Sequence, residues 1–242
     1  MAAATIPVRT LHSDHRFFRT MAYVASATIV VGFSQSYFLK TFTGAPPLPL
    51  FVHMHAMIFS SWLILYVVQS ALVAAGRVDL HRRLGFVGAA LAVLMLLVGL
   101  ATAILAAKSG YRGIPGLLAP SPQVFLIVPL RDIFLFSLFA GLGLFFRRRP
   151  AFHKRMMLLA LVGGLTPAGV ARLPGISAFP ALVGAILLIF HLACPVYDFA
   201  RNRRIYPSYL CGALLSSVLA APVLLKLGTS PAWLRAADWM TR

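Results

Sequence analysis

Long apolar runs recur along this chain and constrain its fold more than any other feature. A bilayer core about 30 Å thick is crossed by roughly 20 apolar residues in a helix. Hydrophobic residues make up 60% of the 242 residues and charged residues only 11%, which excludes an ordinary soluble domain. The sequence therefore predicts an all-α, polytopic membrane helical bundle of seven transmembrane helices. The runs lie near 19–40, 51–75, 83–106, 124–146, 153–172, 179–199 and 208–226.

Little sequence remains outside these runs, so we expect residues 1–242 to form a single transmembrane domain. After the last run, Ser230 and Pro231 are typical of the N-cap and the first residue of a helix. The short helix predicted over 230–241 contains two tryptophans, a residue type that is enriched at membrane interfaces. We expect this helix to lie in the outer interface.

The basic residues are distributed unevenly between the two sides of this topology. The chain has 22 Lys and Arg against 5 acidic residues, a net charge of +17. Because basic residues concentrate in cytoplasmic segments, the pattern predicts a cytoplasmic N-terminus, an outer C-terminus and a cell inner-membrane location. We therefore expect the basic residues to interact with the lipid bilayer and not with nucleic acid. The richer side holds Arg9, Arg16, Arg19, Arg77, Arg82, Arg83, Arg147, Arg148, Arg149, Lys154, Arg155, Arg201, Arg203 and Arg204, and the poorer side holds Lys40, Lys108, Arg112, Arg172, Lys226, Arg235 and Arg242.

The second run carries a polar and aromatic stripe. His53 and His55 open it, and at 100° per residue they point to nearly opposite faces of a helix. We therefore do not expect the two histidines to chelate one ion together. The face of His55 is either an interior packing surface or part of a site, and the residues that continue it are Phe59, Trp62, Tyr66 and Gln69.

In the sixth run, Gly184, His191 and Asp198 recur every seven residues and share one helix face. His191 is the most deeply placed histidine of the chain. Ionisable groups inside a span are costly and usually face the bundle interior or a cavity. His191 is either a hydrogen-bonded structural residue or one with a cofactor or proton role.

A weak internal repeat, R-x-x-x-H-[RK]-R-[LM], occurs at 77–84 and at 149–156. Both copies join an inward-running span to an outward-running one, so His81 and His153 should lie at similar depth near the cytoplasmic face. Such a pair suits axial ligation of a haem, with Arg77 and Arg82 meeting the propionates. The alternative is that these basic residues only orient the protein and contact lipid phosphates.

A second polar group is expected at the outer ends of the spans, below the connection 107–123. Arg131 lies inside the fourth run, and its simplest role is an ion pair with a carboxylate. The functional alternative is a site for an anion or a quinone head group. The residues expected near this outer polar pocket are His53, His55, Gln69, Arg131, Asp132, Arg172 and Gln35.

The stretch from His53 through Gln69 and Arg77 to His81-Arg-Arg-Leu-Gly85, with the later His153-Lys-Arg-Met-Met, resembles a helix-pair signature. The signature it resembles is that of a poorly characterised family of bacterial multi-pass membrane proteins. More distantly, the histidine-bearing helices are similar to those of small transmembrane b-type cytochromes, which hold haem between facing histidines and exchange electrons with quinones. The likeness implies one b-type haem at most, because no second intramembrane histidine lies at the depth of His191.

Three functions follow as hypotheses. The first is a redox membrane protein that binds one haem through ligands among His81, His153 and His191 and works with a quinone. The second is a non-catalytic subunit or assembly factor that binds other membrane subunits. The third is a metal-dependent membrane enzyme or a small-solute transporter, although the sequence has no HExxH or HxxxH spacing for zinc.

Overall fold

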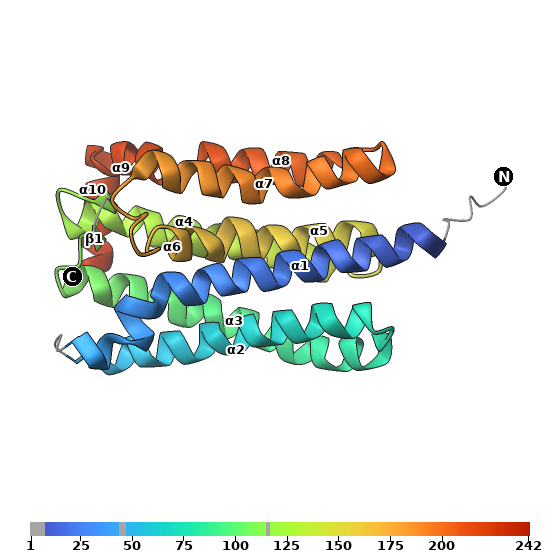
Figure 1. Cartoon of the computed structure of the whole chain (residues 1–242). Helices are drawn as coiled ribbons and strands as arrows, with labels where there is room; N and C mark the ends of the chain where they lie inside the picture. Colours follow the sequence, from blue (N-terminus) through green and yellow to red (C-terminus); the bar gives the residue numbers. More distant parts are fainter. Residues whose placement is uncertain (1–7, 44–46, 115–116) are drawn as a thin grey trace.

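The computed structural model describes residues 8–43, 47–114 and 117–242. In it the chain forms a bundle of long helices that run back and forth between two ends (Figure 1). The elements are α1 (Val8–Phe33), η1 (Ser34–Phe38), η2 (Lys40–Thr43), α2 (Leu50–Ala74), α3 (Val78–Lys108), β1 (Gly113–Ile114), β2 (Leu117–Leu118), α4 (Pro122–Phe145), α5 (Pro150–Leu159), η3 (Ala160–Leu165), α6 (Thr166–Val170), α7 (Pro180–Asn202), α8 (Pro207–Val218), α9 (Ala221–Gly228) and α10 (Pro231–Thr241).

Five of the described helical segments are long and apolar enough to cross a membrane. The helices α8 and α9 meet the same criterion only as a pair, which is bent by 50° and would make a sixth span. The expectation of an all-α, multi-pass membrane bundle is therefore supported. The five segments are Asp14–Phe38, Leu50–Ala74, Val78–Lys108, Pro122–Phe145 and Pro180–Arg201.

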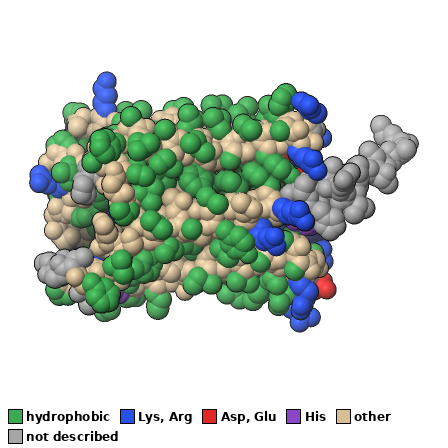
Figure 2. Space-filling view, in the orientation of Figure 1, with side chains coloured by type: hydrophobic (Ala, Val, Ile, Leu, Met, Phe, Trp, Pro, Cys, Tyr) green, Lys and Arg blue, Asp and Glu red, His purple; other side chains and the backbone are tan. Residues whose placement is uncertain are grey.

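The surface of the bundle is apolar between two more polar ends (Figure 2). Large apolar side chains such as Ile64, Val93 and Ile189 are 65%, 58% and 68% exposed along the helices. An apolar surface of this extent faces lipid rather than water. We call one end the arginine-rich end; the turns between α2 and α3, α4 and α5, and α7 and α8 lie there. We call the other the loop end, where 109–114, 117–121, α9 and α10 lie.

The fifth apolar run is broken into α5, the π-helical turn η3 and α6. Pro167 has no N–H, so the carbonyl of Gly163 loses the donor that a regular α-helix would supply four residues later. The neighbouring Gly164 lets η3 approach α4, since a Cβ atom there would lie 2.7 Å from that of Phe136. The break is therefore a close-packed joint at the centre of the bundle.

The predicted C-terminal helix is present as α10, and Ser230 is its N-cap, accepting the N–H of Trp233 at 3.4 Å. The indole Nε1 of Trp233 donates to the carbonyl of Gln123 at 2.8 Å. This tryptophan therefore fastens α10 to the start of α4, whereas Trp239 is 76% exposed.

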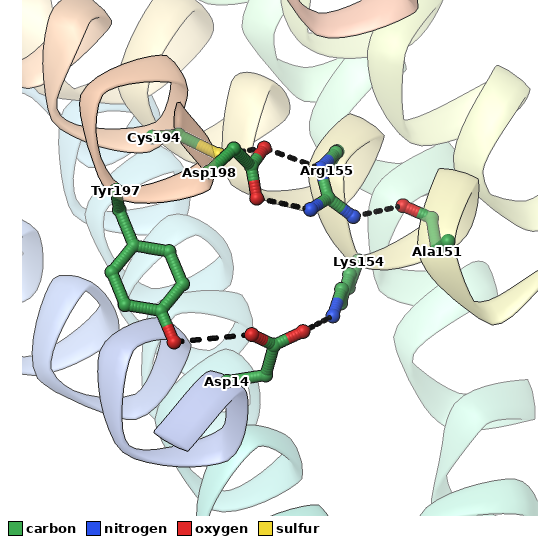
Figure 3. A network of polar contacts seen from close by, with 7 residues as sticks. All are labelled: Asp14, Ala151, Lys154, Arg155, Cys194, Tyr197 and Asp198. Carbon is green, nitrogen blue, oxygen red and sulfur yellow. Dashed lines mark hydrogen bonds and ion pairs between the residues drawn. The ribbon is translucent and has the colours of Figure 1, made fainter. Parts of the chain in front are cut away.

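One predicted surface charge is not at the surface. Arg155, assigned from sequence to the cytoplasmic charge excess, is completely buried, because α5 packs its side chain against α7. Its Nε donates to Oδ2 of Asp198 at 2.9 Å, its Nη2 pairs with Oδ1, and its Nη1 donates to the carbonyl of Ala151 at 2.8 Å (Figure 3). Pairing with a carboxylate at two points offsets the cost of burying the guanidinium.

A second ion pair lies beside this one and includes a residue of α1. Asp14 of α1 is an ion-pair partner of Lys154 and accepts a hydrogen bond from the hydroxyl of Tyr197 at 3.0 Å (Figure 3). Together the two pairs join α1, α5 and α7 near the arginine-rich end.

We expect Asp198→Asn to destabilise the protein by about 3 kcal/mol, because it leaves the buried guanidinium of Arg155 without a counter-charge. Thermal unfolding in detergent measures the loss as a lower midpoint. The matched control is Asp79→Asn, since Asp79 is an exposed carboxylate in the first turn of α3. The double variant Arg155→Met with Asp198→Leu should recover most of the loss. A double variant no more stable than Asp198→Asn would contradict this account of the pair.

Candidate functional site

A cavity of about 1000 Å³ lies in the half of the bundle nearer the loop end. Most of its wall is apolar, and residues from α1, α2, α3, α4, α6 and α7 contribute to it. Several side chains that can ionise or form hydrogen bonds also line it. Prominent among them are Gln35, His55, Arg131, Asp132, Arg172 and His191.

Arg131 anchors the polar part of the wall. One terminal nitrogen, Nη1, donates to Oδ1 of Asp132 at 2.6 Å and to the carbonyl of Gly163 at 3.3 Å. The other, Nη2, donates to the carbonyl of Ser216 at 2.7 Å. These are carbonyls that the helices leave without a partner, one through Pro167 and the other in the last turn of α8. The guanidinium therefore donates hydrogen bonds to carbonyls at two helix interruptions, and it also forms the expected ion pair, here with Asp132.

Arg172 gives the cavity wall a positive charge. Its Nη1 donates to the carbonyl of Ala168 at 2.9 Å, its Nη2 donates to the hydroxyl of Tyr111 at 3.2 Å, and its guanidinium lies over the ring of Phe33. Within the described residues it forms no ion pair. Since Arg131 and Asp132 neutralise each other, Arg172 remains as an uncompensated cation on this wall.

Three polar atoms on this wall are buried without a hydrogen-bond partner among the described residues. They are Nε of Arg131, Nδ1 of His55 and Nε2 of His191. His191 is only 4% exposed, and its other nitrogen, Nδ1, lies 2.8 Å from the carbonyl of Leu187. Buried polar atoms are nearly always paired in folded proteins. An orphan set that α2, α4 and α7 contribute to the lining of one cavity is therefore a reason to expect a ligand or water there.

The outer pocket expected from sequence differs in membership from this cavity. His55, Arg131, Asp132 and Arg172 line it together, and His55 stacks on Phe59 with ring centroids 3.9 Å apart. His53 is not among the lining residues: its Nδ1 is 3.1 Å from the hydroxyl of Tyr37. Gln69 also lies outside, because it follows His55 by about 21 Å along α2.

The cavity reaches the apolar flank of the bundle. Its lining includes Val30 of α1 and Leu188 of α7, which are 46% and 51% exposed. Gly184, one turn before Leu188, also lines it and is exposed. A molecule dissolved in the bilayer therefore meets an opening between apolar side chains without crossing the polar loop end.

The repeated histidines lie together, as the sequence repeat predicts, at the arginine-rich end. The rings of His81 and His153 are 6.2 Å apart between centroids. Nδ1 of His153 donates to the carbonyl of Gly143 at 2.8 Å, and the buried Nδ1 of His81 has no partner among the described residues. Arg77 and Arg82 are exposed nearby in sequence.

The three histidines proposed as haem ligands do not form one group. His191 lines the large cavity, whereas His81 and His153 do not. Asp198, expected to share a function with His191, is instead the partner of Arg155. Helix position alone does not identify which neighbouring helix carries the matching charge, so the sequence pattern does not indicate the pairing of Asp198 with Arg155.

No group of three or more His, Cys, Asp or Glu side chains that could hold a metal ion occurs among residues 8–43, 47–114 and 117–242. Cys194 is buried and Cys211 exposed, and both are free thiols. Comparison of the chain with protein-family models, curated proteins and solved structures found no match.

Proposed function

We propose that this chain is a seven-span inner-membrane protein that binds a bilayer-soluble small molecule of the quinone class and takes part in its electron transfer. The observation that carries the proposal is the large apolar cavity, whose lining includes three residues with a polar atom that has no partner among the described residues. Quinones combine an apolar tail with a head group of hydrogen-bonding oxygens, which matches both kinds of wall.

The energetics favour an occupant with a polar head. A buried polar atom without a partner costs about 1–3 kcal/mol, and three such atoms belong to His55, Arg131 and His191. A ligand head group that both donates and accepts hydrogen bonds beside these atoms would recover much of that cost. The cation of Arg172 favours electron-rich oxygens, and the apolar opening at Val30 and Leu188 suits entry from lipid.

The seven-span topology rests on treating α5, η3 and α6 as one interrupted span and α8 with α9 as another. The segment Pro150–Val170 would extend about 30 Å at 1.5 Å per residue, which matches a bilayer core. Placing the arginine-rich end in the cytoplasm follows the positive-inside rule and puts the cavity in the outer half of the membrane.

Gly184→Trp should weaken binding of a decyl-substituted benzoquinone, because the indole would fill the cavity rim. We expect a loss of affinity of about tenfold or more, measured by titration calorimetry in lipid nanodiscs with empty nanodiscs subtracted. A Cβ atom on Gly184 meets nothing within 4 Å, so the substitution need not disturb the fold.

The matched control is Gly85→Trp. Gly85 also lies in a helix with nothing within 4 Å of its Cβ position, but it does not line the cavity. It should bind like the parent protein. Equal affinities in the parent and both variants, or no binding by the parent, would contradict the proposed site.

The topology is tested with single cysteines in a chain where Cys194 and Cys211 are replaced by alanine. Ser109→Cys, at the loop end, should react with a membrane-impermeant maleimide in intact spheroplasts. Asp79→Cys, at the arginine-rich end, should react only after the membrane is opened. Both positions are exposed. The reverse pattern would overturn the proposed orientation, and labelling of both from outside would overturn the span count.

A second candidate, a b-type haem at the arginine-rich end, is favoured by the pair His81 and His153. Nδ1 of His153 is occupied by a carbonyl, which leaves Nε2 as its free ring nitrogen, and His81 has an unpartnered Nδ1. A haem held there would supply one-electron transfer. Arg77 and Arg82 would hold its propionates.

The purified protein should then show a Soret band and a reduced-minus-oxidised difference spectrum. His81→Ala and His153→Ala should each remove it, since both nitrogens would be axial ligands, whereas His191→Ala should retain it. Full haem content in both single variants, or none in the parent protein, would reject this candidate and leave the cavity proposal standing.

A further inference from the structure

We propose that His191 makes the cavity selective for the reduced, hydroxyl-bearing form of its ligand over the oxidised, carbonyl-bearing form. The inference rests on the proposed function, because it specifies which form of a quinone-class molecule the same cavity holds. It concerns binding alone and assigns no electron acceptor.

The geometry of the imidazole supplies the argument. The carbonyl of Leu187 can only accept a hydrogen bond, so Nδ1 of His191, 2.8 Å away, is the nitrogen that carries the proton. In the neutral ring, Nε2 then carries a lone pair and can only accept. This atom is buried and unpartnered on a residue that is 4% exposed and lines the cavity. It requires a donor from the ligand.

No side chain among the described residues donates a hydrogen bond to Nε2 of His191. The terminal nitrogens of Arg131 are directed to Asp132 and to the carbonyls of Gly163 and Ser216, which leaves Nε as its unpaired donor. The carboxylate of Asp132, which also lines the cavity, is a second acceptor. The cavity lining therefore combines hydrogen-bond acceptors with a donor. A ligand hydroxyl group can donate to one of the acceptors and accept from the donor.

The two ligand forms differ in the hydrogen bonds they can make to this wall. A quinol hydroxyl can donate to Nε2 of His191 and accept from Arg131. A quinone carbonyl can only accept, so it would leave Nε2 unpaired and place two acceptors opposite each other. Sites that pair a ligand hydroxyl reject analogues without it, because their own buried group is then left unsatisfied.

Asp198, which the sequence predicts to share a function with His191, is already paired. Asp198 lies two turns further along the same face of α7, about 10 Å away at 1.5 Å per residue. Its carboxylate is held by Arg155 at both oxygens. A structural role shared with Asp198 therefore does not account for the free nitrogen.

The test compares three molecules of nearly the same shape: a decyl-substituted benzoquinol, its quinone and its dimethyl ether, which has no hydroxyl donors. Affinities are measured anaerobically in nanodiscs. The parent protein should bind the quinol about tenfold or more tightly than either other form. His191→Leu should remove this preference by weakening quinol binding, with quinone affinity kept within about twofold.

His191→Gln should retain part of the preference, because its amide oxygen still accepts a hydrogen bond. It also tests the proposal if His191→Leu does not fold. His53→Leu is the matched control, since His53 does not line the cavity, and it should keep the full preference.

The outcomes separate this inference from the function on which it rests. Equal binding of quinol, quinone and ether by the parent protein, with loss of all three in Gly184→Trp, would overturn the role of His191 and keep the cavity site. Absence of binding by all three would overturn the proposed function itself. A quinol preference that persists in His191→Leu would also overturn the inference.

Discussion

The guanidinium of Arg131 is the interaction on which the arrangement around the cavity depends. In a bundle covered by lipid, each carbonyl that a helix leaves unpaired must find a donor within the protein. Pro167 and the end of α8 free two such carbonyls, and Arg131 of α4 donates to both while Asp132 balances its charge. One side chain thereby holds α4, η3 and α8 in a fixed relation beside the cavity.

The two halves of the bundle use charge in different ways. Near the arginine-rich end, Arg155 with Asp198 and Lys154 with Asp14 form pairs in which every carboxylate has a cationic partner. Near the loop end, the cavity wall keeps an uncompensated Arg172 and an unpartnered His191 nitrogen. Satisfied pairs serve packing, whereas unsatisfied groups around a cavity are available to a ligand, so the cavity is the stronger site candidate.

Much of the fold could be predicted because lipid imposes length and polarity on each span. Runs of about 20 apolar residues coincide with α1, α2, α3, α4 and α7. The repeat predicts that His81 and His153 lie at similar depth, and their ring centroids are 6.2 Å apart. Of the residues expected near the outer polar pocket, His55, Arg131, Asp132 and Arg172 line the cavity and Gln69 does not, whereas His191 also lines it. Depth along each helix could have shown this, since His191 lies at the middle of α7 and Gln69 near the far end of α2.

By itself the sequence determined that this chain is a helical membrane protein with basic residues concentrated on one side, because hydropathy and charge act locally, residue by residue. Only the tertiary structure decided which polar groups are satisfied. Arg155 looks like any other orienting arginine until α7 brings Asp198 against it, and His191 looks like a partner of Asp198 until that carboxylate is occupied. Pairing between helices depends on their rotation and depth relative to one another, which local patterns do not encode.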